Sequence, residues 1–283
     1  MDERMSDKNL LAERFGSTPA SDEPLDGGAM VHKQMAQRGS VRQFRPDPVP
    51  DSVLRRLCAL AFCAPTKSDL QQRDIIIVES PDLRAEIGGL LAEGPLGQKW
   101  LKNLPNLLIF CGNNRRQRRI HELRGKAFAN DHLDAFFNAS VDAAIALSSF
   151  VIVAEAEGLG VCPISAVRNH AATLARLLRL PSYVFPVAGL AVGYPAEAPQ
   201  RSHRLPLSVT LHYDAYSEDG LDGKIDEYDR RRSAAQPHTF QRYLKQFGPS
   251  DSYGWSEDKA RQYAFPERQD FGAYVREIGF KLE

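Results

Sequence analysis

The 283-residue sequence lacks several features that would narrow its function at once. Lys plus Arg and Asp plus Glu number 36 each, so there is no basic excess of the kind that nucleic-acid binders carry. Glycine-rich phosphate loops are missing too: Gly158 and Gly160 have no third glycine, and no G-x-x-x-x-G-K-[ST] run occurs. Side-chain cations must therefore do much of the work of holding any bound phosphate.

Cysteine is scarce. The four cysteines, Cys58, Cys63, Cys111 and Cys162, form no C-x-x-C pair and have no histidine at zinc-ligand spacing. We interpret them as buried free thiols and expect no metal site. Because no charged-then-apolar signal segment stands at the N-terminus, the sequence predicts a cytoplasmic location.

No apolar run reaches the ~20 residues that a membrane span needs. The longest, from about residue 133 to 157, is interrupted by Asp142, Ser148 and Ser149. We predict a long core helix with no polar face, and such a helix must be covered by its own domain and by a partner subunit.

Apolar patterns and turn residues predict the other elements. Continuous runs such as residues 75–78 are typical of strands inside a sheet, and Ser80-Pro81 is typical of a helix start. The expected strands are 74–79, 107–111, 161–165 and 184–192, with a weaker signal over 209–213; the expected helices are 30–37, 51–62, 133–157, 169–180, 222–231, 257–263 and 270–278, with a further helix from residue 81. We expect a mobile extension over residues 1–29, a core over 30–215 and a helical arm and lid over 216–283.

Two short segments carry the clearest chemical signal. In Arg38-Gly39-Ser40-Val41-Arg42, two arginines flank a small hydroxyl residue, and such donors can converge on one phosphate. The segment Thr66-Lys67-Ser68-Asp69-Leu70-Gln71 follows about two dozen residues later. Together they resemble the flavin-binding N-terminal half of the nitroreductase family.

The resemblance extends from about residue 31 to the C-terminus. Residues 155–160, Arg168-Asn169, Gly193-Tyr194-Pro195 and Arg204-Leu205-Pro206 are similar, in order and gaps, to the major oxygen-insensitive, NADPH-preferring FMN nitroreductase group. This implies an α+β nitroreductase-like fold with a central, mainly antiparallel sheet flanked by helices. It also implies a homodimer that exchanges its C-terminal arm.

The resemblance assigns FMN binding to one set of residues: Arg38, Ser40, Arg42, Thr66, Lys67, Ser68, Gln71, Pro163, Ile164, Ser165, Ala166 and Arg204. The arginines and Ser40 would surround the phosphate and ribityl chain, and Gln71 would bond the polar edge of the flavin. Segments 66–68 and 163–166 would come from different subunits. No side chain is assigned as catalytic, because flavin N5 carries the hydride.

The implied activity is an NAD(P)H-dependent FMN oxidoreductase, a nitroreductase, that reduces small-molecule oxidants (nitroaromatics, quinones or flavins) by ping-pong hydride transfer. Arg232, with Arg231 beside it, falls near an arginine that holds the 2′-phosphate of NADPH in that group; a solvated helix end is an equal alternative, and NADH stays open as the donor. No nucleic-acid or membrane partner is expected.

Departures from the family pattern keep other functions open. Asp69 replaces an asparagine, and its charge would be unfavourable beside an anionic reduced flavin unless it pointed away or paired with Lys67. Ser165-Ala166 replaces two glycines, which leaves open a flavin storage or sensor protein without efficient turnover. The arginines at 115, 116, 118 and 119 leave open a polyanion binder, although a solvated segment explains them more simply.

Overall fold

The computed structural model describes residues 7–17, 28–93 and 98–283. The chain divides into two compact units. We call residues 40–200 with 268–283 the sheet unit, and residues 1–39 with 201–267 the arm unit. Gly94, Pro95 and Gly97, residue types that indicate a break in the chain before Trp100, lie outside the described residues.

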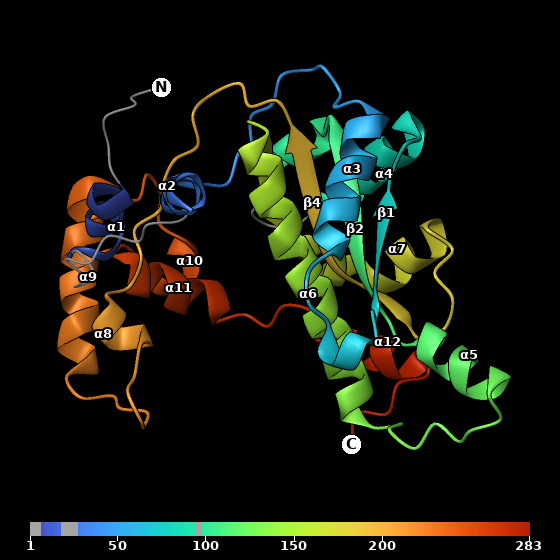
Figure 1. The fold of residues 1–283 in the computed structure, drawn as a ribbon. Helices are drawn as coiled ribbons and strands as arrows, with labels where there is room; N and C mark the ends of the chain where they lie inside the picture. The colour runs from blue at the N-terminus through green and yellow to red at the C-terminus, as the bar shows by residue number, and fades with distance from the viewer. Residues whose placement is uncertain (1–6, 18–27, 94–97) are drawn as a thin grey trace. The chain divides into compact units, whose positions relative to one another are not determined.

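The sheet unit is built on four antiparallel strands in the order β1-β2-β4-β3 (Figure 1). They are β1 (Arg73–Ile77), β2 (Asn106–Asn113), β3 (Gly160–Ile164) and β4 (Val184–Gly193). Every residue of β2 is buried, and alternate side chains serve opposite faces. Leu108 and Phe110 join one core cluster, whereas Leu107, Ile109 and Cys111 join the other. The α+β fold class and the buried strands β2 and β4 predicted from the sequence are confirmed. The apolar run of β1 predicted a strand inside the sheet, but β1 lies at its edge and is only partly buried after Arg73, because it pairs with β2 alone.

Helices cover both faces of this sheet. On one face, α3 (Asp51–Phe62) and α6 (Leu133–Ala156) enclose a core that contains Leu57 and Phe150. On the other, α4 (Pro81–Leu91) and α7 (Ala171–Leu177) contribute Ile87 and Leu174. The Ser80 hydroxyl accepts the backbone N–H of Leu83 at 3.2 Å, which confirms the predicted cap of α4. Shorter elements connect these: η1 (Lys67–Asp69), η2 (Lys99–Asn103), α5 (Arg115–Leu123) and η3 (Ser165–His170).

Helix α6 is the one helix among the described residues that is long and apolar enough to cross a membrane by length and composition. It packs instead on α3 and along the sheet, and it buries Ala139, Ala143 and Phe150. One face stays uncovered, with Leu133, Phe137 and Val141 exposed at four-residue spacing. Since residues four apart share a helix face, these side chains form an apolar stripe.

Some details differ from the sequence-based expectation. Cys63 is exposed, whereas the other three thiols are buried, and burial raises the pKa of Cys111 to about 12. The helix expected over 169–180 begins later and ends earlier, as α7, and η3 precedes it. The strand signal over 209–213 was wrong: residues Leu207–Thr210 form a short helix, α8, because the described strands all lie in the sheet unit and offer no partner there.

The arm unit is helical. It contains α1 (Asp7–Phe15), α2 (Ala29–Gln37), α8, α9 (Leu221–Ala235), α10 (Leu244–Phe247) and α11 (Trp255–Tyr263). Helix α1 packs beside α2, so part of the expected extension is helical; residues 1–6 and 18–27 lie outside the described residues. Helix α12 (Phe271–Glu277) belongs to the sheet unit instead of the arm, because Tyr274, Val275 and Phe280 are buried against Phe185.

Candidate functional site

The 66–71 loop of the sheet unit has an unusual backbone. Ser68, Asp69 and Gln71 adopt left-handed conformations, with φ of 48°, 55° and 54°. Side chains other than glycine rarely occupy this region, and such strain persists only where surrounding contacts impose it. The loop that the sequence assigned to the flavin is therefore held in shape by its neighbours.

Asp142 of α6 provides one of these contacts. Its fully buried carboxylate accepts the backbone N–H of Lys67 and that of Gln72, both at 2.9 Å. Arg73 provides another, donating to the carbonyl oxygens of Phe62 at 2.6 Å and Ala64 at 3.0 Å. The sequence predicted neither role. The only signal was the lone carboxylate of Asp142 inside an apolar helix.

The side chains of this loop face different partners. The Gln71 amide donates to Asp69 Oδ1 at 3.1 Å, so the carboxylate of Asp69 is paired with Gln71. Lys67 and Ser68 line a cavity of about 390 Å³ together with residues of α5 and α6, among them Asn138. Thr66 Oγ1 accepts the backbone N–H of Gln71 at 3.4 Å.

The opposite edge of the sheet carries the other predicted flavin contacts. The backbone N–H of Val41 donates to the carbonyl of Val161 in β3 at 3.0 Å, which fixes Ser40 and Arg42 beside that strand. Gly160 permits this approach, because a Cβ atom there would lie 2.9 Å from the Val41 side chain. Residues 163–166 follow at the far end of β3, where Pro163 and Ser165 are exposed and Ile164 is buried.

These two groups lie far apart in one chain. The 66–71 loop leads into β1, whereas residues 40–42 and 163–166 flank β3, and β2 and β4 separate these strands. With strands about 4.8 Å apart, the edges are separated by roughly 14 Å. One sheet unit does not bring the predicted flavin contacts together.

The arm unit gathers a second set of cations. Arg14, Arg38 and Arg204 line a cavity of about 450 Å³, and the backbone N–H of Arg204 donates to the Arg14 carbonyl at 2.6 Å. Burial lowers the pKa of Arg204, and the charge of Arg38 lowers it further. Like charges are thus held close together.

Helix α9 carries the predicted donor contacts. Arg231 donates to the carbonyl oxygens of Glu13 at 3.2 Å and Arg204 at 2.8 Å, so its guanidinium is used within the arm unit. Arg232 Nη1 donates to the Tyr228 hydroxyl at 2.9 Å, while its Nε is buried and has no hydrogen-bond partner in the part of the chain that the structure describes. Of the two, Arg232 retains an unused donor.

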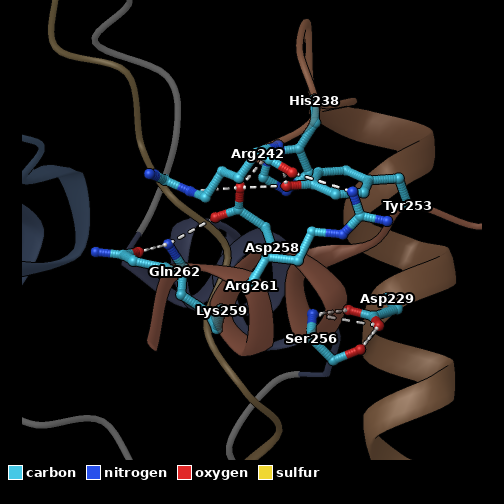
Figure 2. Close-up of polar contacts among 9 residues, drawn as sticks. All are labelled: Asp229, His238, Arg242, Tyr253, Ser256, Asp258, Lys259, Arg261 and Gln262. Atoms are coloured by element: carbon cyan, nitrogen blue, oxygen red, sulfur yellow. Dashed lines mark hydrogen bonds and ion pairs between the residues drawn. The ribbon is translucent and has the colours of Figure 1, made fainter. Parts of the chain in front are cut away.

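A polar network fixes α9 against α11 (Figure 2). Asp229 accepts the backbone N–H and the hydroxyl of Ser256. On α11, the buried carboxylate of Asp258 accepts hydrogen bonds from Arg242, Tyr253 and Lys259, each at 2.9 Å. These contacts therefore fix the position of the helix that carries the arginines of α9.

The donor set of the arm unit fits a phosphate group. Guanidinium groups bind phosphate oxygens through charge-assisted hydrogen bonds, and clustered cations that lower one another's pKa gain most from an anion. A metal is not indicated: the described residues contain no group of three or more His, Cys, Asp or Glu side chains that could hold one.

Several known proteins resemble this chain in sequence and fold. The sequence is 31% identical over 261 residues to FMN reductase (NAD(P)H) of Bacillus subtilis (strain 168), covering 89% of this chain and 98% of that protein. It is 26% identical over 245 residues to FMN reductase (NADPH) of the same strain, covering 85% and 94%. The structure of NfrA2 from B. megaterium aligns with a TM-score of 0.79 at 28% identity over 89% of this chain and 98% of that one. The nitroreductase family model matches residues 35–194, and the model of its C-terminal domain matches residues 202–283. The chain therefore belongs to the nitroreductase family.

Proposed function

We propose that this chain is an NAD(P)H-dependent FMN oxidoreductase in which Arg38 and Arg204 bind the cofactor phosphate. The cluster of mutually repelling arginines in the arm unit, in which Arg14 is buried, Arg38 is half-buried and Arg204 is exposed, is the observation that carries the proposal. FMN offers the phosphate dianion that such a cluster would bind, and the B. subtilis relatives are named as FMN reductases. Ser40, Arg42, the 66–71 loop with Thr66, and residues 163–166 are proposed as further contacts to the same cofactor.

The chemistry that FMN supplies when bound is hydride transfer from NAD(P)H to an oxidant. The protein's part is to bind, orient and partly desolvate the reacting groups. We propose that donor and oxidant use the same opening in turn, which gives ping-pong kinetics. The oxidants would be nitroaromatics, quinones or flavins.

We propose that NADPH is preferred over NADH. The two donors differ by the 2′-phosphate of NADPH, so discrimination requires a cation with an unused donor. Arg232 is the better candidate, because Arg231 is engaged with backbone carbonyls whereas Arg232 Nε, although buried, has no hydrogen-bond partner among the described residues. The proposal therefore rests on Arg232.

We further propose that two copies of the chain form an obligate homodimer and share each flavin site. The separation of the 66–71 loop from residues 163–166 across the sheet supports this, because contacts to one flavin would then come from two copies. The exposed apolar stripe of α6 supports it as well, since a second copy would cover Leu133, Phe137 and Val141.

Visible absorption of the purified protein, followed by turnover, tests the proposal. Protein incubated with excess FMN and then desalted should be yellow, and it should oxidise NADPH over many turnovers when a quinone, a nitroaromatic or free flavin is present. Protein that stays colourless would refute cofactor binding. A yellow protein that does not oxidise NADPH or NADH would instead be a flavin storage or sensor protein.

A further inference from the structure

Helix α1 lies outside both family models, which begin at residues 35 and 202, yet it takes part in the arginine cluster. Leu10 is fully buried and Arg14 is only 5% exposed. A charged side chain is rarely buried unless it is paired or hydrogen-bonded. The contacts of Arg14 therefore indicate what α1 does.

The guanidinium of Arg14 caps the C-terminal end of α2. Its Nη1 donates to the carbonyl oxygens of Met35 at 3.3 Å, Ala36 at 3.1 Å and Arg38 at 3.1 Å. The last carbonyl groups of a helix have no partner within the helix, and a cation there is favoured by the helix dipole. Arg14 thus holds the backbone from which the Arg38 side chain extends.

The main chain of Arg14 bonds the second arginine of the proposed phosphate site, Arg204. Its carbonyl oxygen accepts the backbone N–H of Arg204 at 2.6 Å. Next to it, the Glu13 carboxylate accepts hydrogen bonds from Nε and Nη2 of Arg201, the shortest at 2.9 Å. Gly16 ends α1 at a φ of 84°, where a Cβ atom would lie 3.0 Å from the Arg231 guanidinium carbon. The end of α1 is therefore fitted closely to the segment that carries Arg204.

We propose that Arg14 is a positioning residue of the cofactor-phosphate site, through which α1 sets the spacing of Arg38 and Arg204. This inference rests on the proposed function, because it concerns the same phosphate. The Arg14 side chain bonds the backbone of Arg38, and its main-chain carbonyl bonds that of Arg204. Removal of the side chain would free Arg38 directly, and it would loosen the end of α1 that holds Arg204. Helix α1 would then be a part of the cofactor site that this chain adds outside the segments matched by the family models.

The electrostatics of the cluster support this role. Burial, together with the charges of Arg204, Arg38 and Arg201, lowers the pKa of Arg14 to about 10 against the opposing effect of Glu13. Three guanidinium groups are thus held near one another at an electrostatic cost. A phosphate bound among them would offset that cost.

The test measures how tightly full-length apoprotein binds FMN and riboflavin, which lacks the phosphate. Quenching of flavin fluorescence gives the two dissociation constants. For Arg14→Ala, we expect FMN to bind about tenfold to a hundredfold more weakly and riboflavin to bind as it does to the wild type. Arg115→Ala, which removes an exposed arginine of α5 in the sheet unit, is the matched control and should change neither constant. Circular dichroism of each variant reports whether it folds.

The outcomes separate the two proposals. An unchanged preference for FMN over riboflavin in folded Arg14→Ala would overturn the positioning role while leaving the oxidoreductase proposal intact. If Arg14→Ala does not fold, Arg14→Lys decides, because lysine keeps the charge but not the planar fork: a weakened FMN preference supports the role, and a wild-type preference overturns it. Wild-type apoprotein that binds neither flavin would refute the proposed function itself.

Discussion

The buried carboxylate of Asp142 accepts the backbone N–H of Lys67 at 2.9 Å, across 75 residues of sequence. The other carboxylate oxygen accepts the backbone N–H of Gln72. A single side chain of α6 therefore bonds both ends of a loop that contains three residues in left-handed conformations. This relationship links the stability of the core to the shape of a proposed flavin contact.

Asp142→Asn should therefore lower the free energy of unfolding by about 1 to 3 kcal/mol, because one acceptor becomes an N–H₂ donor that faces a buried N–H. Urea denaturation followed by circular dichroism measures the loss. Asp134→Asn, an exposed change in the first turn of the same helix, is the control and should cost a few tenths of a kcal/mol. Equal stability of the two variants would contradict the assigned role of Asp142.

Arg204→Ala and Arg42→Ala should each weaken FMN binding by about 1.5 to 3 kcal/mol, because a phosphate loses a charge-assisted hydrogen bond. Fluorescence titration of the apoproteins gives the dissociation constants. Arg56→Ala, an exposed change on α3, should bind like the wild type. Wild-type affinity in both site variants would remove these residues from the phosphate site.

Arg232→Ala should raise KM for NADPH by about tenfold or more and leave the constants for NADH nearly unchanged, because only the binding of a remote phosphate is lost. Steady-state kinetics with both donors measure this. Arg230→Ala, which removes the exposed neighbour two positions earlier, should leave both donors unaffected. An equal effect of Arg232→Ala on both donors would mean that Arg232 supports α9 instead.

Phe137→Asp, in the exposed stripe of α6, should convert the proposed dimer to a species near 32 kDa and reduce FMN loading. A buried charge in an apolar interface is strongly unfavourable. Sedimentation velocity of the two proteins provides the measurement. Leu123→Asp, an equally exposed apolar site on α5, should leave assembly intact; a dimeric Phe137→Asp protein would exclude this face as the interface.

Stability should fall between pH 7 and pH 5, in part through His203. Burial lowers the pKa of His203, and the nearby Arg231 charge lowers it further; Arg231 Nη1 lies 3.2 Å from His203 Nδ1. Between the lowered folded value and the ordinary value near 6.5, the unfolded chain binds more protons, so stability decreases as pH falls through that window. His203→Gln should show a shallower slope than the wild type in denaturation at each pH, and an identical slope would refute this assignment.

The sequence by itself determined the family and most of the secondary structure of the sheet unit. Continuous apolar runs defined the buried strands, the Ser80 and Pro81 pair defined the start of α4, and the order of short motifs around Ser40, Gln71 and Arg204 was enough to identify the nitroreductase family. These are local signals, because the residues that form each of them are close together in the chain.

Only the tertiary structure decided how the candidate site is supported and divided. Arg14, Arg73 and Asp142 act on backbone groups of distant or separate segments, and a single charged residue among many carries no local sign of such a partner. The separation of the 66–71 loop from residues 163–166 follows from the strand order β1-β2-β4-β3. Periodicity specifies which face of a strand is buried but not which strands are neighbours, because strand pairing depends on contacts between segments far apart in sequence.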